Sequence, residues 1–334
     1  MGNNLDDLAN CMPFELRGYL FQRLIGVGSS SHVFEVYSIK YKQKFSAKVM
    51  KLEDCCLDEE GNLLEPEIHA LMNLDSPNII RIYEFFVYSN FLFLILEYCP
   101  KGTILDEVNQ LKAIPPRKNR SYVIPICQAI QYCHSKGIAH RDIKPSNIFI
   151  DSYGRPKIAD FGLCALLLPK QQLHTICGSI PYVAPEVLSG EAHDPFKADI
   201  FALGVTLYQM ATGELPYDNY YQNYRGFPLY VSTNYVDFVS KMISIDPTKR
   251  PSMQEILEYP YFKEGNTSTK IIRRKFSAIS PSNPSLSFNR VIDRSKLSNP
   301  LFMDKSMHHH NSSLKHIFKS QSYTFKNDEH NASS

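Results

Sequence analysis

Two carboxylates and an amide stand close together in the middle of the chain, in the stretch 138–162. Asp142 precedes Asn147 by five residues, and Asp160 ends an apolar run. Their oxygens are hard ligands of the kind that Mg2+ binds, and a carboxylate can also accept the proton of an attacking hydroxyl. Lys144 adds a positive charge for the negative charge that develops on a transferred phosphoryl group. This set of side chains predicts metal-assisted phosphoryl transfer.

Strands and a helix are expected to position these residues. Between Tyr19 and Met50, apolar and polar residues alternate around a glycine-rich turn, which predicts three strands. Gly26 and Gly28 in this turn would let the backbone lie close to phosphate groups, although two glycines alone are better explained by a plain hairpin. Residues 79–99 predict two more strands, and the apolar stripe in 121–136 predicts a helix that supports the central stretch from below.

The central stretch matches the pattern H-R-D-x-x-x-x-N followed by D-F-G, so the chain resembles the protein kinase superfamily. Later blocks agree, including VAPE at 183–186 and DPTKRP at 246–251. The resemblance implies an α+β fold of two lobes, a small β-rich N-lobe and a larger, mainly helical C-lobe. The DIKPSN motif resembles the serine/threonine branch, and LHTICGSIPYVAPE resembles the calcium/calmodulin-dependent and AMP-activated kinase group.

The resemblance carries roles over to the polar residues of the central stretch. Asp142 would accept the proton of the acceptor hydroxyl or orient it, and Lys144 would steady the transferred phosphoryl group. Asn147 and Asp160 would hold the Mg2+ that accompanies ATP. His140 would be structural rather than a catalytic base.

Lys48, in the AKVM block, resembles the strand lysine that holds the α- and β-phosphates of ATP. Its partner would be the carboxylate of Glu67, on a helix with one apolar face, and Glu65 is the alternative partner. Pro66 fits only the first turn of a helix, so this helix is expected to start late.

The resemblance also implies a nucleotide pocket between the lobes. Backbone groups of Glu97 and Cys99 would hydrogen-bond the adenine base, and three apolar side chains, Val33, Ala47 and Phe149, would enclose it. Each of these residues is equally well explained as ordinary core. The complete expected pocket consists of Gly26, Val27, Gly28, Val33, Ala47, Lys48, Leu96, Glu97, Cys99 and Phe149.

Thr175 stands eleven residues before Glu186, where related kinases often carry an activating phosphate. An upstream kinase would add this phosphate, and Arg141 would bind it. The resemblance implies two further contacts inside the C-lobe. Asp199 would bind the backbone of the loop that holds the catalytic residues, and Arg250 would form a buried ion pair with Glu186.

Two features concern the substrate. Between Tyr217 and Val231 the chain is too short for the loop, helix and loop of its relatives, so a substrate-docking helix is expected to be shortened or missing. The acidic residues that select arginine-rich peptides are absent, because Thr103, Ser146 and Gln209 stand at the matching places. A preference for basic peptides is therefore not expected.

The chain of 334 residues is long enough for one two-lobed unit with extensions. We expect an N-terminal extension at 1–18, a catalytic domain at 19–262 whose lobes meet near residues 99 and 100, and a tail at 263–334. The tail carries 12 Lys and Arg against 5 Asp and Glu, is rich in serine, and is expected to be disordered. Its RRKFS sequence at 273–277 has two interpretations, a regulatory phosphorylation site or a segment that occupies the chain's own cleft.

Eight cysteines show neither zinc-ligand spacing nor a disulfide framework, which favours a reducing compartment inside the cell. The longest strongly apolar run, at 91–96, is far too short for a membrane span, and the N-terminus lacks a signal-peptide core. Asp6 stands where a myristoylation signal has Ser or Thr. We therefore expect a cytoplasmic location, with the nucleus as the alternative, and no nucleic-acid partner.

Taken together, these observations predict a serine/threonine protein kinase that uses ATP and Mg2+ and transfers the γ-phosphoryl group to a hydroxyl of protein substrates. The main alternative is a pseudokinase, a scaffold that binds partners without turnover. Ser31, in the place of a third loop glycine, and the short segment after Tyr217 motivate this alternative, while the complete set of phosphate and metal ligands argues against it. A small-molecule kinase is a third possibility, against which the VAPE block argues.

Overall fold

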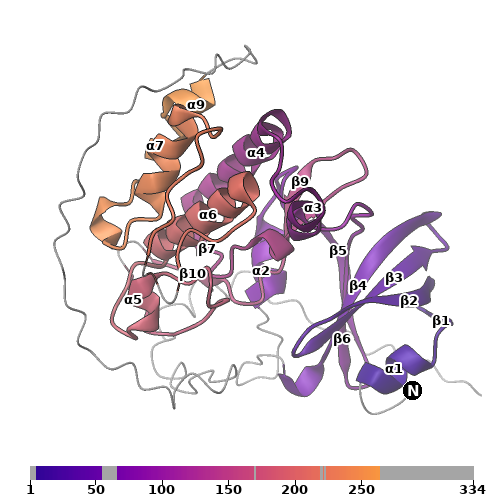
Figure 1. Ribbon diagram of the computed structural model, residues 1–334. Coiled ribbons are helices and arrows are strands. Elements are labelled where there is room, and N and C mark those ends of the chain that lie inside the picture. The colour runs from indigo at the N-terminus through magenta and orange to yellow at the C-terminus, as the bar shows by residue number, and fades with distance from the viewer. Residues whose placement is uncertain (1–4, 55–65, 169–170, 219–220, 222, 264–334) are drawn as a thin grey trace, which may run out of the picture. The chain divides into compact units, whose positions relative to one another are not determined.

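The computed structural model describes residues 5–54, 66–168, 171–218, 221 and 223–263. These residues form an N-lobe built on a β-sheet and a C-lobe built mainly of helices (Figure 1). The expected two-lobed α+β fold is therefore confirmed. Apart from Lys263, the tail at 263–334, with its expected disorder and its RRKFS sequence, lies outside the described residues.

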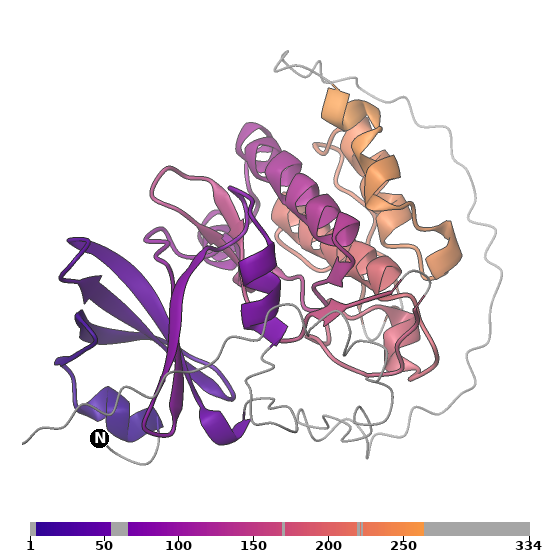
Figure 2. The ribbon, with the colours of Figure 1, turned by 180° about the vertical axis from the view of Figure 1, so that it is seen from behind.

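The N-lobe sheet has six strands in the order β1-β2-β3-β4-β6-β5, and every neighbouring pair is antiparallel. The alternating sequence pattern predicts five of these strands, and β1 comes from the N-terminal extension. The strands are β1 (Phe14–Leu16), β2 (Tyr19–Val27), β3 (Ser31–Ser38), β4 (Gln43–Lys51), β5 (Ile82–Tyr88) and β6 (Phe91–Glu97). One helix of this lobe, α2 (Pro66–Asn73), lies on the inner side of the sheet, between it and the C-lobe (Figures 1 and 2).

Successive side chains of a strand point to opposite faces, so each buried strand supplies two apolar layers. The inner layer joins the core shared with α2 and the C-lobe. The outer layer is aromatic, and the short helix α1 (Leu5–Asn10) packs on it through Leu5 and Leu8. Leu8 is fully buried, which makes the N-terminal extension an integral part of this lobe. We call this outer layer the outer core; its aromatic members are Tyr19, Phe21, Phe34, Phe45, Phe86, Phe91 and Phe93.

Two long helices, α4 (Pro116–Ser135) and α6 (Pro195–Thr212), form the centre of the C-lobe (Figure 2). Helix α4 contains the helix expected at 121–136. None of the helices in the described ranges combines the length and the apolar character needed to cross a membrane. The other helices of this lobe are α3 (Ile104–Leu111), α5 (Pro185–Leu188), α7 (Thr233–Met242), α8 (Met253–Leu257) and α9 (Pro260–Lys263).

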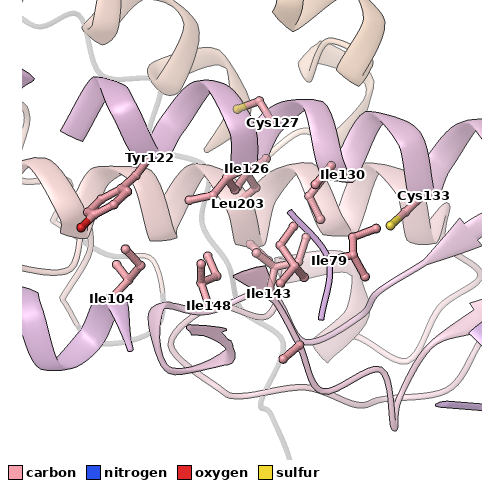
Figure 3. Close-up of a cluster of buried hydrophobic side chains, with 14 of the residues drawn as sticks. Ile79, Ile104, Tyr122, Ile126, Cys127, Ile130, Cys133, Ile143, Ile148 and Leu203 are labelled. Atoms are coloured by element: carbon pink, nitrogen blue, oxygen red, sulfur yellow. The ribbon is translucent and has the colours of Figure 1, made fainter. Parts of the chain in front are cut away.

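The loop 140–147, which holds the candidate catalytic residues, rests on the packed core of the C-lobe. Figure 3 shows Ile143 from this loop and Ile148 just after it in one cluster with Ile126 and Ile130 of α4. All four side chains are buried. Two short antiparallel pairs hold the neighbouring backbone, namely β7 (Ile138–Ala139) with β10 (Ala165–Leu166) and β8 (Ile148–Ile150) with β9 (Pro156–Ile158).

Between α6 and α7, the described residues, which leave out 219, 220 and 222, contain no helix. Aromatic rings fill this region instead. Tyr221 packs edge-on against Phe201 of α6 with 5.7 Å between ring centres, and its hydroxyl donates a hydrogen bond to the carbonyl of Val183. The expectation of a shortened or missing docking helix agrees with these residues.

We expect Leu8→Ala to lower the free energy of unfolding by about 2–4 kcal/mol, because it removes a fully buried side chain from the outer core. Urea denaturation followed by circular dichroism measures this change. Leu111→Ala is the matched control, since Leu111 is 41% exposed, and it should change stability by about 1 kcal/mol or less. Equal effects of the two substitutions would show that α1 adds nothing to the core of the N-lobe.

Candidate active site

Lys48 connects three segments that are far apart in the sequence. Its Nζ lies 2.5 Å from Oε2 of Glu67, the second residue of α2, and 2.9 Å from Oδ1 of Asp160. Helix α2 begins at Pro66, where proline needs no amide hydrogen, so the expected late start is seen. Burial alone would lower the pKa of Lys48, but the charges of Glu67 and Asp160 outweigh it and raise this pKa. The alternative partner Glu65 lies outside the described residues.

The carboxylate of Asp142 is held by three neighbours. Its Oδ2 accepts hydrogen bonds from Nζ of Lys144 at 2.6 Å and from Nδ2 of Asn147 at 3.0 Å. Its Oδ1 accepts from the backbone amide of Ser179 at 3.0 Å, and Lys144 also donates to the Ser179 hydroxyl at 2.6 Å. Asp142 is therefore held in a fixed orientation, with the ammonium group of Lys144 beside it.

Asp199, at the start of α6, fixes the backbone of the loop. Its carboxylate is buried and accepts the amide hydrogens of His140 at 2.8 Å and of Arg141 at 2.7 Å. Arg141 has a φ of 68°, in the left-handed region that non-glycine residues rarely adopt, and these bonds stabilise it there. The His140 ring lies 4.6 Å from the ring of Phe161 and its Nε2 is 3.1 Å from the carbonyl of Ala159, which is a structural role, as expected.

The donor chemistry of the site fits Mg2+. Asn147 uses its Nδ2 for Asp142, which leaves its amide oxygen as an acceptor. The Asp160 side chain is 47% exposed and uses only Oδ1 for Lys48. Burial raises the pKa of Asp160, but Lys48 outweighs this effect and lowers it, so the carboxylate stays charged. In the described part of the chain, no cluster of three or more acidic, His or Cys side chains could hold a metal alone, which suits an ion that takes its remaining ligands from phosphates and water.

The expected role of Ala47 in the nucleotide pocket is wrong. In the β3–β4 and β4–β6 pairings, Lys48 lies opposite Val33, whereas Ala47 lies opposite Ile95 and is fully buried in the outer core. Adjacent residues of a strand point to opposite faces, so Ala47 cannot share the face of Lys48. Ser46, which the sequence analysis missed, takes that place. Strand alternation counted back from Lys48 would have found it.

Ser46 and the segment after β6 are in contact. Ser46 lies opposite Leu96, and its hydroxyl donates to the carbonyl of Glu97 at 2.9 Å. The Glu97 side chain lies 2.8 Å from Nζ of Lys157 on β9. Cys99 is partly buried, and burial, followed by the charge of Glu97, raises its pKa to about 12. Its thiol is therefore protonated.

The glycine-rich turn is a tight hairpin. Gly26 lies opposite Val33, Val27 is 68% exposed, and the amide of Gly28 donates to the carbonyl of Ser31 at 2.7 Å. A Cβ at position 28 would approach that carbonyl oxygen to 3.3 Å, a tight contact that favours glycine there. In the C-lobe, Phe149 lies in β8 and packs against the core that the two lobes share.

The backbone of Thr175 lies within hydrogen-bond distance of the Arg141 side chain. Nη2 of Arg141 donates to the Thr175 carbonyl at 3.3 Å and Nη1 to the Leu163 carbonyl at 3.4 Å. No carboxylate pairs with Arg141 among the residues that the structure describes. The guanidinium therefore lies next to the threonine with only backbone carbonyls as partners among the described residues.

Arg250 is fully buried and satisfies all of its donors. Two parallel bonds reach the carboxylate of Glu186, at 2.6 and 2.8 Å. The others reach the backbone carbonyls of Ser244, Lys197 and Ile245, between 2.8 and 3.2 Å. This ion pair joins the VAPE block to the end of the C-lobe, as the resemblance implies.

A two-lobed fold with a buried lysine between two carboxylates, above a loop that carries Asp142, Lys144 and Asn147, is the architecture of a protein kinase domain. A family model described as the protein kinase domain matches residues 19–262. The chain therefore belongs to the protein kinase family.

Its relatives include several protein kinases, one of which is a serine/threonine kinase by name. Similar proteins are the carbon catabolite-derepressing protein kinase of Secale cereale (32% identical, 74% of this chain and 52% of the relative), the maternal embryonic leucine zipper kinase of Xenopus tropicalis (34%, 75% and 40%) and CBL-interacting serine/threonine-protein kinase 16 of Arabidopsis thaliana (32%, 75% and 57%). The chain spans about half the length of these relatives. The family, its serine/threonine branch and the likeness to the calcium/calmodulin-dependent and AMP-activated kinase group agree with these matches.

We expect Arg250→Met to lower the free energy of unfolding by about 3–5 kcal/mol, because it leaves the Glu186 carboxylate without its partner in a largely buried site. The double variant Glu186→Gln with Arg250→Met should recover a large part of this loss. Urea denaturation of both variants measures the difference. If the double variant is no more stable than the single one, the unpaired charge is not the cause of the loss.

Proposed function

We propose that the chain is an active serine/threonine protein kinase, which transfers the γ-phosphoryl group of ATP to a Ser or Thr hydroxyl of protein substrates. The observation that carries this proposal is the contact of Lys48 with both Glu67 and Asp160, at 2.5 and 2.9 Å. This contact brings a phosphate-binding cation from the N-lobe to a metal-binding carboxylate of the C-lobe. We also propose a cytoplasmic or nuclear location.

The residues of the site have different roles in phosphoryl transfer. Asp142, oriented by Ser179 and Asn147, accepts the proton of the attacking hydroxyl or orients that hydroxyl. Lys144 stabilises the negative charge on the transferred group, and Lys48 binds the phosphates of the nucleotide. Mg2+, bound by Asn147 and Asp160, would supply neutralisation of the charge on the phosphate oxygens.

The features that motivated the pseudokinase alternative do not remove a catalytic group. Ser31 closes the glycine-rich turn through its backbone carbonyl, a bond that any residue can accept. The short region between α6 and α7 packs against the carbonyl of Val183, outside the contacts of Lys48 and Asp142. We therefore favour an enzyme over a scaffold.

Substrate selection is proposed not to rest on basic residues. Thr103 caps α3 by exchanging hydrogen bonds with Asp106, and Gln209 accepts a hydrogen bond from the Tyr182 hydroxyl at 2.7 Å. These side chains serve internal contacts and carry no negative charge. This supports the expectation that the chain has no preference for basic peptides.

Asp160→Asn is expected to lower label transfer from ATP to a degenerate peptide array by about a thousandfold, because the amide cannot neutralise the metal. The purified full chain is incubated with labelled ATP and Mg2+, and incorporation is counted peptide by peptide. Asp237→Asn is the matched control, since this aspartate is an exposed residue of α7 that pairs with Lys241 on the same helix. No transfer by the parent, or equal transfer by parent and Asp160→Asn, would contradict the proposed activity.

Thr175→Ala is expected to lower kinase activity about tenfold in protein that an upstream kinase has phosphorylated, because Arg141 loses a charge-assisted partner. Mass spectrometry locates the phosphate, and initial rates are compared before and after phosphatase treatment. Phosphatase should slow the parent to the rate of Thr175→Ala and leave the variant unchanged. An unchanged rate in Thr175→Ala would eliminate this form of regulation.

A further inference from the structure

A buried carboxylate lies beside the segment that joins the lobes. This segment, residues 97–102, runs from β6 to α3, and we call it the hinge. Glu35 of β3 is only 3% exposed, and its Oε2 accepts a hydrogen bond from the hydroxyl of the hinge residue Tyr98 at 2.7 Å. The same carboxylate is 2.6 Å from Nη2 of Arg23 on β2 and 2.5 Å from Nζ of Lys44 on β4.

Strand register explains why Glu35 and the hinge meet. Glu35 lies opposite Arg23 in the β2–β3 pair and opposite Ser46 in the β3–β4 pair. It stands two residues after Val33, so it shares the face of Val33 and Lys48. Glu35 and Ser46 are therefore neighbours on the inner face of the sheet, and each bonds one hinge residue, Tyr98 and Glu97 respectively.

The bond to Tyr98 is charge-assisted. Burial alone would raise the pKa of Glu35, but hydrogen bonds from Lys44, Tyr98 and Arg23 outweigh it and lower this pKa to about 2. The carboxylate is therefore ionised at neutral pH, and hydrogen bonds to ionised acceptors are stronger than neutral ones. Arg23 and Lys44, at 65% and 50% exposure, already neutralise the carboxylate. The bond from Tyr98 adds a connection to the hinge.

The hinge is held from the C-lobe as well. Nζ of Lys157 on β9 lies 2.8 Å from the Glu97 carboxylate, and the amide of Glu97 donates to the carbonyl of Arg81 at 2.9 Å. Of these two successive hinge residues, Tyr98 thus has its side-chain partner in the N-lobe and Glu97 has its side-chain partner in the C-lobe. A free hinge would lose conformational entropy when a ligand binds to its backbone, and these bonds reduce that loss in advance.

We propose that Glu35, together with Ser46, holds the hinge against the roof of the nucleotide pocket and is thereby a positioning residue for the base of the bound nucleotide. The proposal rests on the proposed function for the identity of that nucleotide. Glu35 acts through Tyr98 and touches no reacting atom. Loosening the hinge therefore weakens nucleotide binding and leaves the rate of the phosphoryl step unchanged.

The test removes one hydroxyl. Tyr98→Phe is expected to weaken ADP binding by the full chain about fivefold to tenfold, measured by titration calorimetry, and to raise KM for ATP without lowering kcat. Tyr19→Phe is the matched control, since the Tyr19 hydroxyl donates to the Glu84 carboxylate at 2.9 Å and so joins β2 to β5 without touching the hinge. The control should leave ADP affinity within about twofold of the parent. Equal weakening in both variants, or no weakening in Tyr98→Phe, overturns the proposal.

A double variant tests whether the two residues act together. If Glu35 works through Tyr98, Glu35→Gln with Tyr98→Phe should bind ADP no more weakly than Glu35→Gln alone. Additive losses overturn the link between the two residues. Tyr98→Phe keeps the proposal testable if Glu35→Gln does not fold, because it leaves the carboxylate and its two cations in place.

Amide hydrogen exchange of the nucleotide-free chain separates this proposal from the proposed function. The backbone amides of Cys99, Lys101 and Gly102 should exchange faster in Tyr98→Phe than in the parent, and at the parent rate in Tyr19→Phe. If the parent binds no nucleotide, the proposed function fails, while the exchange rates still decide whether Glu35 holds the hinge. Unchanged exchange, or faster exchange without weaker nucleotide binding, overturns the positioning role.

Discussion

The ammonium of Lys48 is the interaction on which the rest of the site depends. A lysine with 13% of its side chain exposed is unfavourable unless opposite charges are near, and here Glu67 and Asp160 come from two other segments. Strand β4, helix α2 and the chain after β9 must all be in place before this charge is compensated. The two ion pairs of Lys48 therefore require these three segments to lie in the arrangement that builds the nucleotide site.

In the C-lobe, too, buried charged side chains are compensated by nearby partners, here largely by backbone groups. The buried Asp199 is compensated by two amide hydrogens of the loop, and this lets Arg141 keep a left-handed conformation. The buried Arg250 is compensated by Glu186 and three carbonyls. In each case the buried charged group finds its hydrogen-bond partners in this arrangement, so the polar groups help to fix where the loop and the VAPE block lie.

Polar residues that lie within short motifs could be predicted from the sequence. Residues whose neighbours depend on strand pairing could not. The spacing of Asp142, Asn147 and Asp160 pointed to one site because the family pattern is local. Ala47 was misplaced because alternation along β4 was not applied, and the Glu35 contacts were missed because they depend on the registers of three strands and the hinge. Helix α1 and strand β1 were not predicted, since six and three residues are too few to show a periodicity.

The packing of α1 shows that the family match and the hydrophobic core of the N-lobe start at different residues. The family match begins at residue 19, whereas among the described residues the hydrophobic contacts of the N-lobe already include Leu5. A truncation chosen from homology alone would uncover a sheet of phenylalanine rings, and exposed aromatic surface of this kind promotes self-association. The segment that matches the family model therefore leaves out residues that cover the aromatic core of the N-lobe.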